Sequence, residues 1–431
     1  MKTAATTLFA GLSCLGSLAW AAPQALPLHV AQPLEGASVR FGTFEVQRAL
    51  QDGPGRVDRD PKMPGATVAA RQTGKAGDAD ALGLAWKDAW FATLRVQTAP
   101  LDLRPYLKQG TVSFDLKVNE LANGGLAFRL ACGQDCDRKV SYVVPARAAQ
   151  GKGWQHLSYK LACFHRAGDD LRAVTQPFAL DGTGAGDVEI ANIRIDAQGT
   201  PNTTCPDYRT ASVTPAPLQE SWALDWWMPR HDAKLAEIAR RQAGGEPTDL
   251  VFIGDSITHH WEQEHLPLWN QMWGRYHALN LGYGGDRTEN LLWRVQHGEL
   301  DNINPKLIVM MIGTNNYGLR SDAPASTYAG IVRDIAAIRR HQPRAKLLLL
   351  AIFPRGATPA DPARRANDAV NAMLPKLADG KQVFFLDINR AFLAADGTLP
   401  VATFPDLLHP NADGYRLWQR AIQPEIDRLM E

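Results

Sequence analysis

The C-terminal half of this chain contains five residues whose types and order suit acyl-transfer chemistry. Ser256, Gly285 and Asn315 each follow a short apolar run, whereas Asp406 and His409 lie together in a turn near the end of the chain. A serine hydroxyl is a poor nucleophile until a neighbouring base accepts its proton. His409 can be that base, because Asp406 can bind one imidazole nitrogen while the other nitrogen faces Ser256.

The same region offers donors for the oxyanion that forms when a serine attacks an ester. These donors are the backbone N–H groups of Ser256 and Gly285 and the side-chain amide of Asn315. Glycine suits its position, since the lack of a side chain lets the backbone approach a substrate closely. Losing one such donor typically costs roughly 10²–10³ in rate, so the presence of several donors is significant. Together with the nucleophile and its base, they predict a serine esterase. Further candidate substrate contacts are Asp255, Trp261, Tyr317 and Leu407.

The elements that must position these residues alternate between two types of segment. Strand-like runs occupy 249–254, 276–281, 306–312, 345–353 and 382–388, and helix-like stretches occupy 261–273, 288–297, 325–341, 361–379 and the chain from about 411. This alternation predicts a flavodoxin-like α/β domain with a five-stranded parallel sheet in the order 2-1-3-4-5. Groups that follow the first three strands then meet at one edge of the sheet.

The first half of the chain has a different pattern. Short β-rich segments occupy 111–118, 126–132, 140–145, 156–164 and 188–196, with turn-forming clusters between them and no helical periodicity. Such spacing predicts an antiparallel β-sandwich. We therefore expect a sandwich domain at 22–197, a Pro-, Thr- and Ser-rich linker or wrapping strap at 198–222, and the α/β domain at 223–431.

The N-terminus and the net charge restrict the compartment and the partners. Lys2, an apolar stretch to Trp20 and small residues at Ala19 and Ala21 predict a signal peptide at 1–21 that is cleaved after Ala21. The apolar stretch is too short to span a bilayer, so we expect a secreted or periplasmic protein with no integral membrane segment. A net charge of +1 argues against a nucleic-acid partner.

Four cysteines remain after removal of the signal peptide, and all of them precede residue 210. An even number of cysteines in an exported chain suggests disulfides, most simply Cys132–Cys136 and Cys163–Cys205. The alternative is a set of free buried thiols. A zinc site is not expected, because no histidine accompanies the cysteines at finger-like spacing.

Several other site types fit this sequence poorly. The chain has no G-x-S-x-G elbow, and the glycines at 282–285 do not match a dinucleotide-binding loop. His259, His260 and His265 lack the i, i+4 spacing of a metal-binding pair, so we expect no metal and no cofactor and place them at the surface or pocket rim. Six tryptophans lie nearby: Trp222, Trp226, Trp227, Trp261, Trp269 and Trp273. We expect most of them in the core or at an interface, and one or two of them to form a sugar-stacking wall.

Residues 222–431 resemble the SGNH (GDSL) hydrolase family. The blocks that carry the resemblance are GDSIT, NLGYGGDRTENLLWR, GTNN and DLLH, in the order of the family, and the second block is similar to the platelet-activating-factor acetylhydrolase branch. The resemblance implies Ser256 as nucleophile, Gly285 and Asn315 as oxyanion donors beside the Ser256 amide, and Asp406 with His409 as the rest of the triad. The branch favours short acyl groups.

Residues 80–196 resemble the C-terminal β-sandwich of bacterial family-three exo-glucosidases. The segments GTVSFDLKV, LACGQDC, GKGWQHLSYKLACF and VEIANIRI carry this resemblance. It implies a galactose-binding-like fold that helps to handle glycan, and the alternative is a sandwich that only shields or orients the esterase. No sugar-binding residue can be singled out from the sequence.

Together these features predict an exported esterase that removes O-acetyl groups from carbohydrate through an acyl-Ser256 intermediate. One alternative is a broader lipolytic esterase, lysophospholipase or thioesterase, which would require a deep apolar cleft. Another is a glycan-binding protein with a vestigial hydrolase domain, against which the intact Ser256, Asp406 and His409 argue. A third is an acyltransferase that passes the acyl group to a sugar. The glycan, the acylated hydroxyl and the oligomeric state are not fixed by the sequence.

Overall fold

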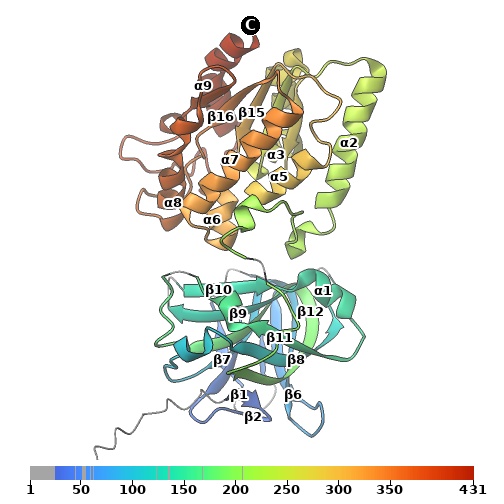
Figure 1. The fold of residues 1–431 in the computed structure, drawn as a ribbon, viewed down its shortest axis with the longest axis vertical. Coiled ribbons are helices and arrows are strands. Elements are labelled where there is room, and N and C mark those ends of the chain that lie inside the picture. Colours follow the sequence, from blue (N-terminus) through green and yellow to red (C-terminus); the bar gives the residue numbers. More distant parts are fainter. Residues whose placement is uncertain are drawn as a thin grey trace, which may run out of the picture.

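A computed structural model of the protein describes residues 25–431, with gaps at 44, 51–54, 59, 62, 123, 134–135, 167 and 206. The predicted signal peptide at 1–21 and its cleavage after Ala21 lie outside the described residues. The chain forms two stacked parts, a β-rich part and an α/β part (Figure 1). Within the described residues, no helix is long and apolar enough to cross a membrane.

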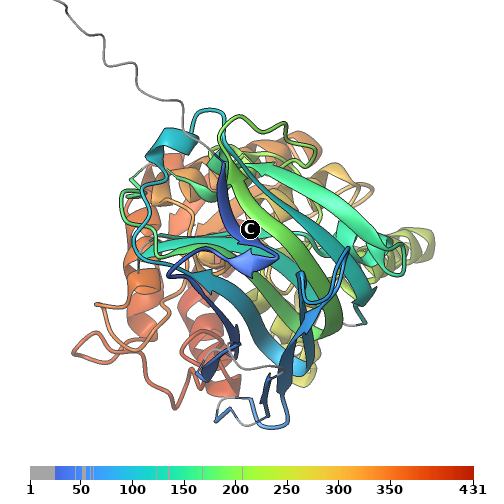
Figure 2. The ribbon, with the colours of Figure 1, turned by 90° about the horizontal axis from the view of Figure 1, so that it is seen from below.

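Antiparallel strands build the β-rich part, which Figure 2 shows from below. Their bounds are β1 (Leu26–Val30), β2 (Gln32–Pro33), β3 (Ser38–Gly42), β4 (Gln47–Ala49), β5 (Gly55–Val57), β6 (Thr67–Thr73), β7 (Ala81–Gln97), β8 (Thr111–Glu120), β9 (Gly125–Gly133), β10 (Cys136–Ser141), β11 (Trp154–Lys160) and β12 (Gln176–Asp196). Every pairing between these strands is antiparallel. Alternate residues such as Phe114 and Leu116 face one apolar core, so the predicted fold class is confirmed.

Two long strands, β7 and β12, run through most of this part. β12 pairs with β9 through residues 176–183 and with β8 through residues 187–196. Its register shifts around Gly182 and Gly186, and a Cβ at either glycine would lie 2.5 Å from the ring of Trp86. These two glycines therefore let β12 bend across the indole while the strand continues.

Two short helical segments show that part of the strand prediction was wrong. The sequence predicts strands at 140–145 and 156–164, whereas the helix α1 (Val143–Ala149) follows β10 and the 3-10 turn η2 (Leu161–Phe164) follows β11. Pro145 lies in the first turn of α1, where a missing N–H breaks no helical hydrogen bond. Short apolar runs give the same hydrophobic signal in either conformation, so periodicity could not separate them.

The α/β part contains a five-stranded parallel sheet. Its strands are β13 (Leu250–Gly254), β14 (Leu279–Gly282), β15 (Leu307–Met311), β16 (Lys346–Leu350) and β17 (Val383–Leu386), in the spatial order β14-β13-β15-β16-β17. All four pairings are parallel. This arrangement is the predicted order 2-1-3-4-5, and it places the carboxyl ends of β13, β14 and β15 side by side.

Helices cover both faces of this sheet. They are α3 (Ser256–Gln263), α4 (Leu266–Trp273), α5 (Thr288–Gln296), α6 (Thr314–Arg320), α7 (Pro324–His341), α8 (Pro362–Asn371) and α9 (Ala412–Met430). Val251 and Ile253 pack in the core that contains side chains of α5 and α7, whereas Leu250 and Phe252 pack with those of α3, α4 and α9. A strand buried on both faces is apolar at every position, which explains the continuous run of β13.

The sequence did not predict the helix α2 (Trp227–Gly244), which precedes the first strand of the sheet. Its buried positions are Trp227, His231, Lys234 and Ile238, a helical spacing in which two of the four residues are polar. His231 binds Glu299 at 3.1 Å, and the amine of Lys234 forms ion pairs on its own helix and on α3. Polar residues at core positions hid the periodicity that would have revealed this helix.

Residues 198–222, called the strap below, connect the two parts and contact both of them. Cys205 is bonded to Cys163 of the β-rich part, and Cys132 is bonded to Cys136, which is the pairing that the sequence suggested. Further along, the buried Ser212 donates its hydroxyl to Asp322, which follows α6. The strap is therefore attached to both parts of the protein.

Candidate active site

Ser256 stands where β13 ends and α3 begins, with 8% of its surface exposed. Asp255 is the N-cap of this helix, and its Oδ1 accepts the backbone N–H of Ile257 at 3.0 Å. The turn is tightly packed, because a Cβ on Gly254 would lie 2.3 Å from the carbonyl oxygen of Met311. This strand-to-helix turn holds the Ser256 hydroxyl at the carboxyl edge of the sheet.

His409 links Ser256 to Asp406 through its two ring nitrogens. The Nε2 atom lies 2.9 Å from the Oγ of Ser256, and the Nδ1 atom lies 2.6 Å from the Oδ2 of Asp406. The other carboxylate oxygen accepts the backbone N–H groups of Leu408 and His409 at 3.0 and 2.7 Å. The residue that follows Asp406, Leu407, has a φ of 60°, which allows the turn to close.

Hydrogen bonds keep the Asp406 carboxylate charged. Burial acts to raise the pKa of Asp406, but the bonds from the backbone and ring of His409 outweigh it and hold that pKa below its ordinary value. A charged carboxylate at Nδ1 favours the tautomer in which Nδ1 carries the proton. Nε2 is then free to accept the proton of the Ser256 hydroxyl.

The other two predicted donors lie on the loops that follow β14 and β15. Gly285 has a φ of 78°, which favours glycine, and Asn315 lies in the first turn of α6. The Nδ2 of Asn315 donates to the backbone oxygen of Asp286 at 3.1 Å, which leaves one amide hydrogen for a ligand. Asn315 is 6% exposed, so its orientation is restricted by its neighbours.

His259 supports the loop that carries Gly285. Its Nδ1 accepts the backbone N–H of Gly284 at 3.2 Å. Burial first, and then the charges of Arg230 and other cationic groups, lower the pKa of His259 to about 2. The ring is therefore neutral at any physiological pH and remains a hydrogen-bond acceptor for this loop.

A buried ion network lies beneath the loop. Arg294 donates from Nε to Asp286 at 2.8 Å and from Nη1 to Glu299, and all three side chains are 0% exposed. The indole of Trp227 donates to the other oxygen of Asp286 at 2.7 Å. This network fixes Asp286, whose backbone oxygen orients Asn315.

The structure brings four of the five predicted residues, Ser256, Gly285, Asn315 and His409, to one hollow of about 330 Å³. Asp406 lies behind His409, where it contacts the ring. The complete lining is Trp222, Trp226, Ser256, His259, His260, Gln263, Gly284, Gly285, Asn315, Leu319, Leu408 and His409.

The four candidate substrate contacts do not line this hollow, and two of them are excluded by burial. Asp255 and Trp261 are 0% exposed. The side chain of Asp255 caps α3 behind the serine, and the indole of Trp261 packs on the ring of Tyr415 at 4.3 Å in the core below the sheet. Tyr317 and Leu407 are half-buried and lie outside the lining. Trp261 points inward because it lies one turn after Ile257, on the core-facing side of α3.

The sequence predicted the kind of wall but not all of its members. It placed His260 at the surface or pocket rim and expected one or two of six tryptophans to form a stacking wall, whereas Gln263, Leu319 and Leu408 were not predicted. Trp222 and Trp226 come from the end of the strap and the residues after it, and Leu408 follows the half-buried Leu407. His260 lies beside His409 with 4.7 Å between ring centres. The cluster of tryptophans and histidines was a signal for this wall, but only the fold shows which of its members reach the site.

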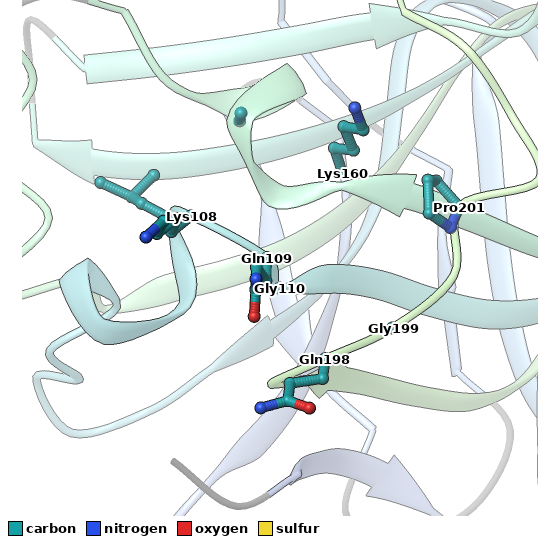
Figure 3. A pocket seen from close by; sticks show the side chains of 9 residues that line it. Lys108, Gln109, Gly110, Lys160, Gln198, Gly199 and Pro201 are labelled. Atoms are coloured by element: carbon teal, nitrogen blue, oxygen red, sulfur yellow. The ribbon is translucent and has the colours of Figure 1, made fainter. Parts of the chain in front are cut away.

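A second hollow of about 380 Å³ lies in the β-rich part, where the strap leaves β12. Figure 3 shows its lining, which includes Lys108, Lys160, Gln198 and Pro201. It contains none of the residues predicted for acyl transfer. In the described part of the chain, no group of three or more His, Cys, Asp or Glu side chains is arranged to hold a metal ion.

Both parts of the chain match known families. Residues 252–417 match the GDSL-like lipase/acylhydrolase family, and residues 51–195 match a galactose-binding domain-like family. Platelet-activating factor acetylhydrolase IB subunit alpha2 from Gallus gallus is 36% identical over 211 residues, which make up 48% of this chain and 86% of that protein.

Two solved structures cover one part each. An acetylxylan esterase from Geobacillus stearothermophilus is 21% identical with a TM-score of 0.35, covering 42% of this chain and 94% of that chain. The extra C-terminal domain of an exo-1,3/1,4-beta-glucanase from a Pseudoalteromonas species is 13% identical with a TM-score of 0.34. The match covers 42% of this chain and 96% of that domain's chain. From the family match and the curated relative, the chain belongs to the GDSL-like lipase/acylhydrolase family and is a carboxylic ester hydrolase with an N-terminal galactose-binding-like domain.

Proposed function

We propose that this chain removes acetyl and other short acyl groups from carbohydrate esters through an acyl-Ser256 intermediate. The observation that carries this proposal is the continuous relay from Ser256 through His409 to Asp406, with 2.9 and 2.6 Å between the bonded atoms. The Gly285 and Asn315 loops lie beside it in the same hollow. Nucleophile, base and oxyanion donors are thus available together.

The reaction follows from the roles of these groups. The Oγ of Ser256 attacks the ester carbonyl while Nε2 of His409 accepts its proton, and the negative charge on the carbonyl oxygen meets the donors of Ser256, Gly285 and Asn315. His409 then returns the proton to the leaving alcohol, which departs and leaves an acyl-serine. A water molecule, activated by the same nitrogen, releases the acid and restores Ser256.

Four observations support the substrate class. The hollow of about 330 Å³ suits a short acyl group, and the curated relative's name describes an acetylhydrolase. Aromatic and polar side chains, including Trp222 and Gln263, form its wall, which is the combination that binds sugar rings. The N-terminal part matches a galactose-binding-like family. The two disulfides support export to an oxidising compartment.

The test is acetate release from acetylated xylan and glucomannan by the purified chain, with Ser256→Ala as the control. Release by the wild type that disappears in Ser256→Ala is the expected result. Cleavage of octanoyl esters in preference to acetyl esters would instead favour a lipolytic esterase. Acetate transfer to an added sugar faster than hydrolysis would indicate an acyltransferase. Glycan retention without Ser256-dependent turnover of any ester would contradict the proposed activity and favour a binding protein.

A further inference from the structure

Trp222 is an exposed residue of the site that the hydrolysis mechanism leaves unused. It lies at the end of the strap, in the short 3-10 turn η4 (Ser221–Ala223), and its indole is 47% exposed. It lines the same hollow as Ser256. An exposed aromatic ring at the rim of an active-site hollow is a common way to bind the apolar face of a ligand.

The edge of the Trp222 ring lies against the glycine that is proposed as an oxyanion donor. A Cβ built on Gly285 would lie only 2.1 Å from the Cη2 atom of the indole. An ester whose carbonyl oxygen reaches the N–H of Gly285 therefore has its bonded groups next to this ring. The alcohol oxygen must lie within reach of His409, which returns a proton to it, and His409 and Trp222 line the same hollow. An acetyl group is small, so the alcohol is the portion of the ester that is large enough to cover the indole.

Neighbouring groups hold the indole in place before any substrate binds. The Trp226 ring stacks beside it at 6.3 Å between centres and 26° between planes, and the Nε1 of Trp226 donates to the backbone oxygen of Trp222 at 2.9 Å. Trp226 in turn packs on the buried His259 ring at 5.7 Å. A ring supported in this way loses little freedom when a ligand stacks on it.

We propose that Trp222 is the stacking platform for the sugar ring of the ester's alcohol, and this assignment rests on the proposed function. A pyranose has an apolar C–H face that suits an indole and hydroxyl groups around its edge. His260 and Gln263 line the same hollow and supply polar groups for those hydroxyls. The strap begins at the β-rich part and ends at Trp222. It thereby contributes a substrate-binding residue to the hydrolase.

The experiment compares two acetyl esters that differ in the ring, monoacetylated methyl xylopyranoside and ethyl acetate. Trp222→Ala should lower kcat/KM for the sugar ester mainly through KM, and the loss should exceed that for ethyl acetate by roughly tenfold. Trp222→Phe should recover most of the difference. Trp90, which is 53% exposed on β7, gives the matched control, since Trp90→Ala should change neither activity.

A binding measurement separates this proposal from the proposed function. In the Ser256→Ala background, titration with the same sugar ester should show a Kd that rises roughly tenfold on adding Trp222→Ala. If the wild type hydrolyses no ester, the proposed function fails, but this titration still shows whether Trp222 binds the sugar ring. Equal losses with both esters would show that Trp222 only supports Gly285 and would overturn the assignment, as would an unchanged Kd.

Discussion

Replacing Arg166 with alanine tests whether the β-rich part holds a proposed oxyanion donor, Asn315, in position. The Nη1 of Arg166 donates to the backbone oxygens of Arg320 at 2.7 Å and Ser321 at 3.0 Å. These carbonyls end α6, a helix of seven residues whose first turn contains Asn315. Arg166 therefore binds one end of the helix that carries Asn315 near its other end.

The contacts of Arg166 set the size of the expected effect. A hydrogen bond from a charged group contributes about 1.5–3 kcal/mol, and the two carbonyls share one donor nitrogen, so they count as roughly one such bond. The guanidinium also stacks on the ring of Tyr208 in the strap at 4.2 Å, which holds Arg166 in place without touching α6. Arg166→Ala should thus weaken the fixation of α6 by about 1.5–3 kcal/mol. Complete loss of an oxyanion donor costs roughly 10²–10³ in rate, so partial misplacement of Asn315 should lower kcat by roughly 10- to 100-fold.

The assay is a double-mutant cycle with steady-state kinetics on a small acetyl ester. Arg166→Ala should lower kcat with little change in KM, and it should have little further effect in the Asn315→Ala background, because the donor that it positions is already gone. Arg172→Ala is the matched control, since Arg172 lies on the same part, forms an exposed ion pair with Asp170 and should leave kcat unchanged. If the losses from Arg166→Ala and Asn315→Ala simply add, Arg166 acts through general stability and the reasoning is refuted.

Three further predictions concern the relay and the groups below it. Asp406→Asn should lower kcat by roughly 10⁴ with a normal fold by circular dichroism, because the amide no longer holds the productive tautomer; near-normal kcat would exclude the relay. Arg294→Met should lower the free energy of unfolding by about 3–5 kcal/mol in denaturant titration, because Asp286 and Glu299 become unpaired buried charges, while Arg416→Met in an exposed pair should cost under about 1 kcal/mol. Burial raises the pKa of Asp255 to about 7, so from about pH 4 to pH 7 the folded state retains a proton that the unfolded chain has lost. That proton makes stability fall by about 1.4 kcal/mol per pH unit in this window, and Asp255→Asn should flatten the slope; an unchanged slope would show that Asp255 is ionised in the fold.

The parallel sheet could be predicted from sequence for a clear physical reason. Strands buried on both faces are continuous apolar runs, and the polar residue after each run marks the edge where chemistry takes place. Ser256, Gly285 and Asn315 could therefore be placed together without knowledge of any contact. The sheet order is confirmed, and the structure brings these residues to one hollow with His409.

The rest of the site depends on tertiary contacts that the pattern of apolar and polar residues along the sequence does not reveal. Whether Trp261 or Trp222 reaches the hollow is decided by the direction of one helix face and by the path of the strap. Trp261, which the sequence suggested as a substrate contact, is in the core, whereas the exposed Trp222 lies against Gly285. The helix α2 escaped prediction because His231 and Lys234 satisfy their polarity through buried partners.

The strap has the composition of a flexible linker, but its contacts are those of a component of the hydrolase. The buried Ser212 accepts hydrogen bonds at its backbone oxygen from Thr288 at 2.9 Å and at its hydroxyl from Asn316 at 3.3 Å, and Asn316 is the neighbour of Asn315. Strand β14 leads to α5 through the Gly285 loop, so Thr288 lies at the start of the helix that follows one donor, and Asn316 lies beside the other. One serine of the strap thus binds the supports of both proposed oxyanion donors. Changes to the strap should therefore lower kcat as well as stability, even though none of the strap residues that the structure describes before Trp222 lines the hollow.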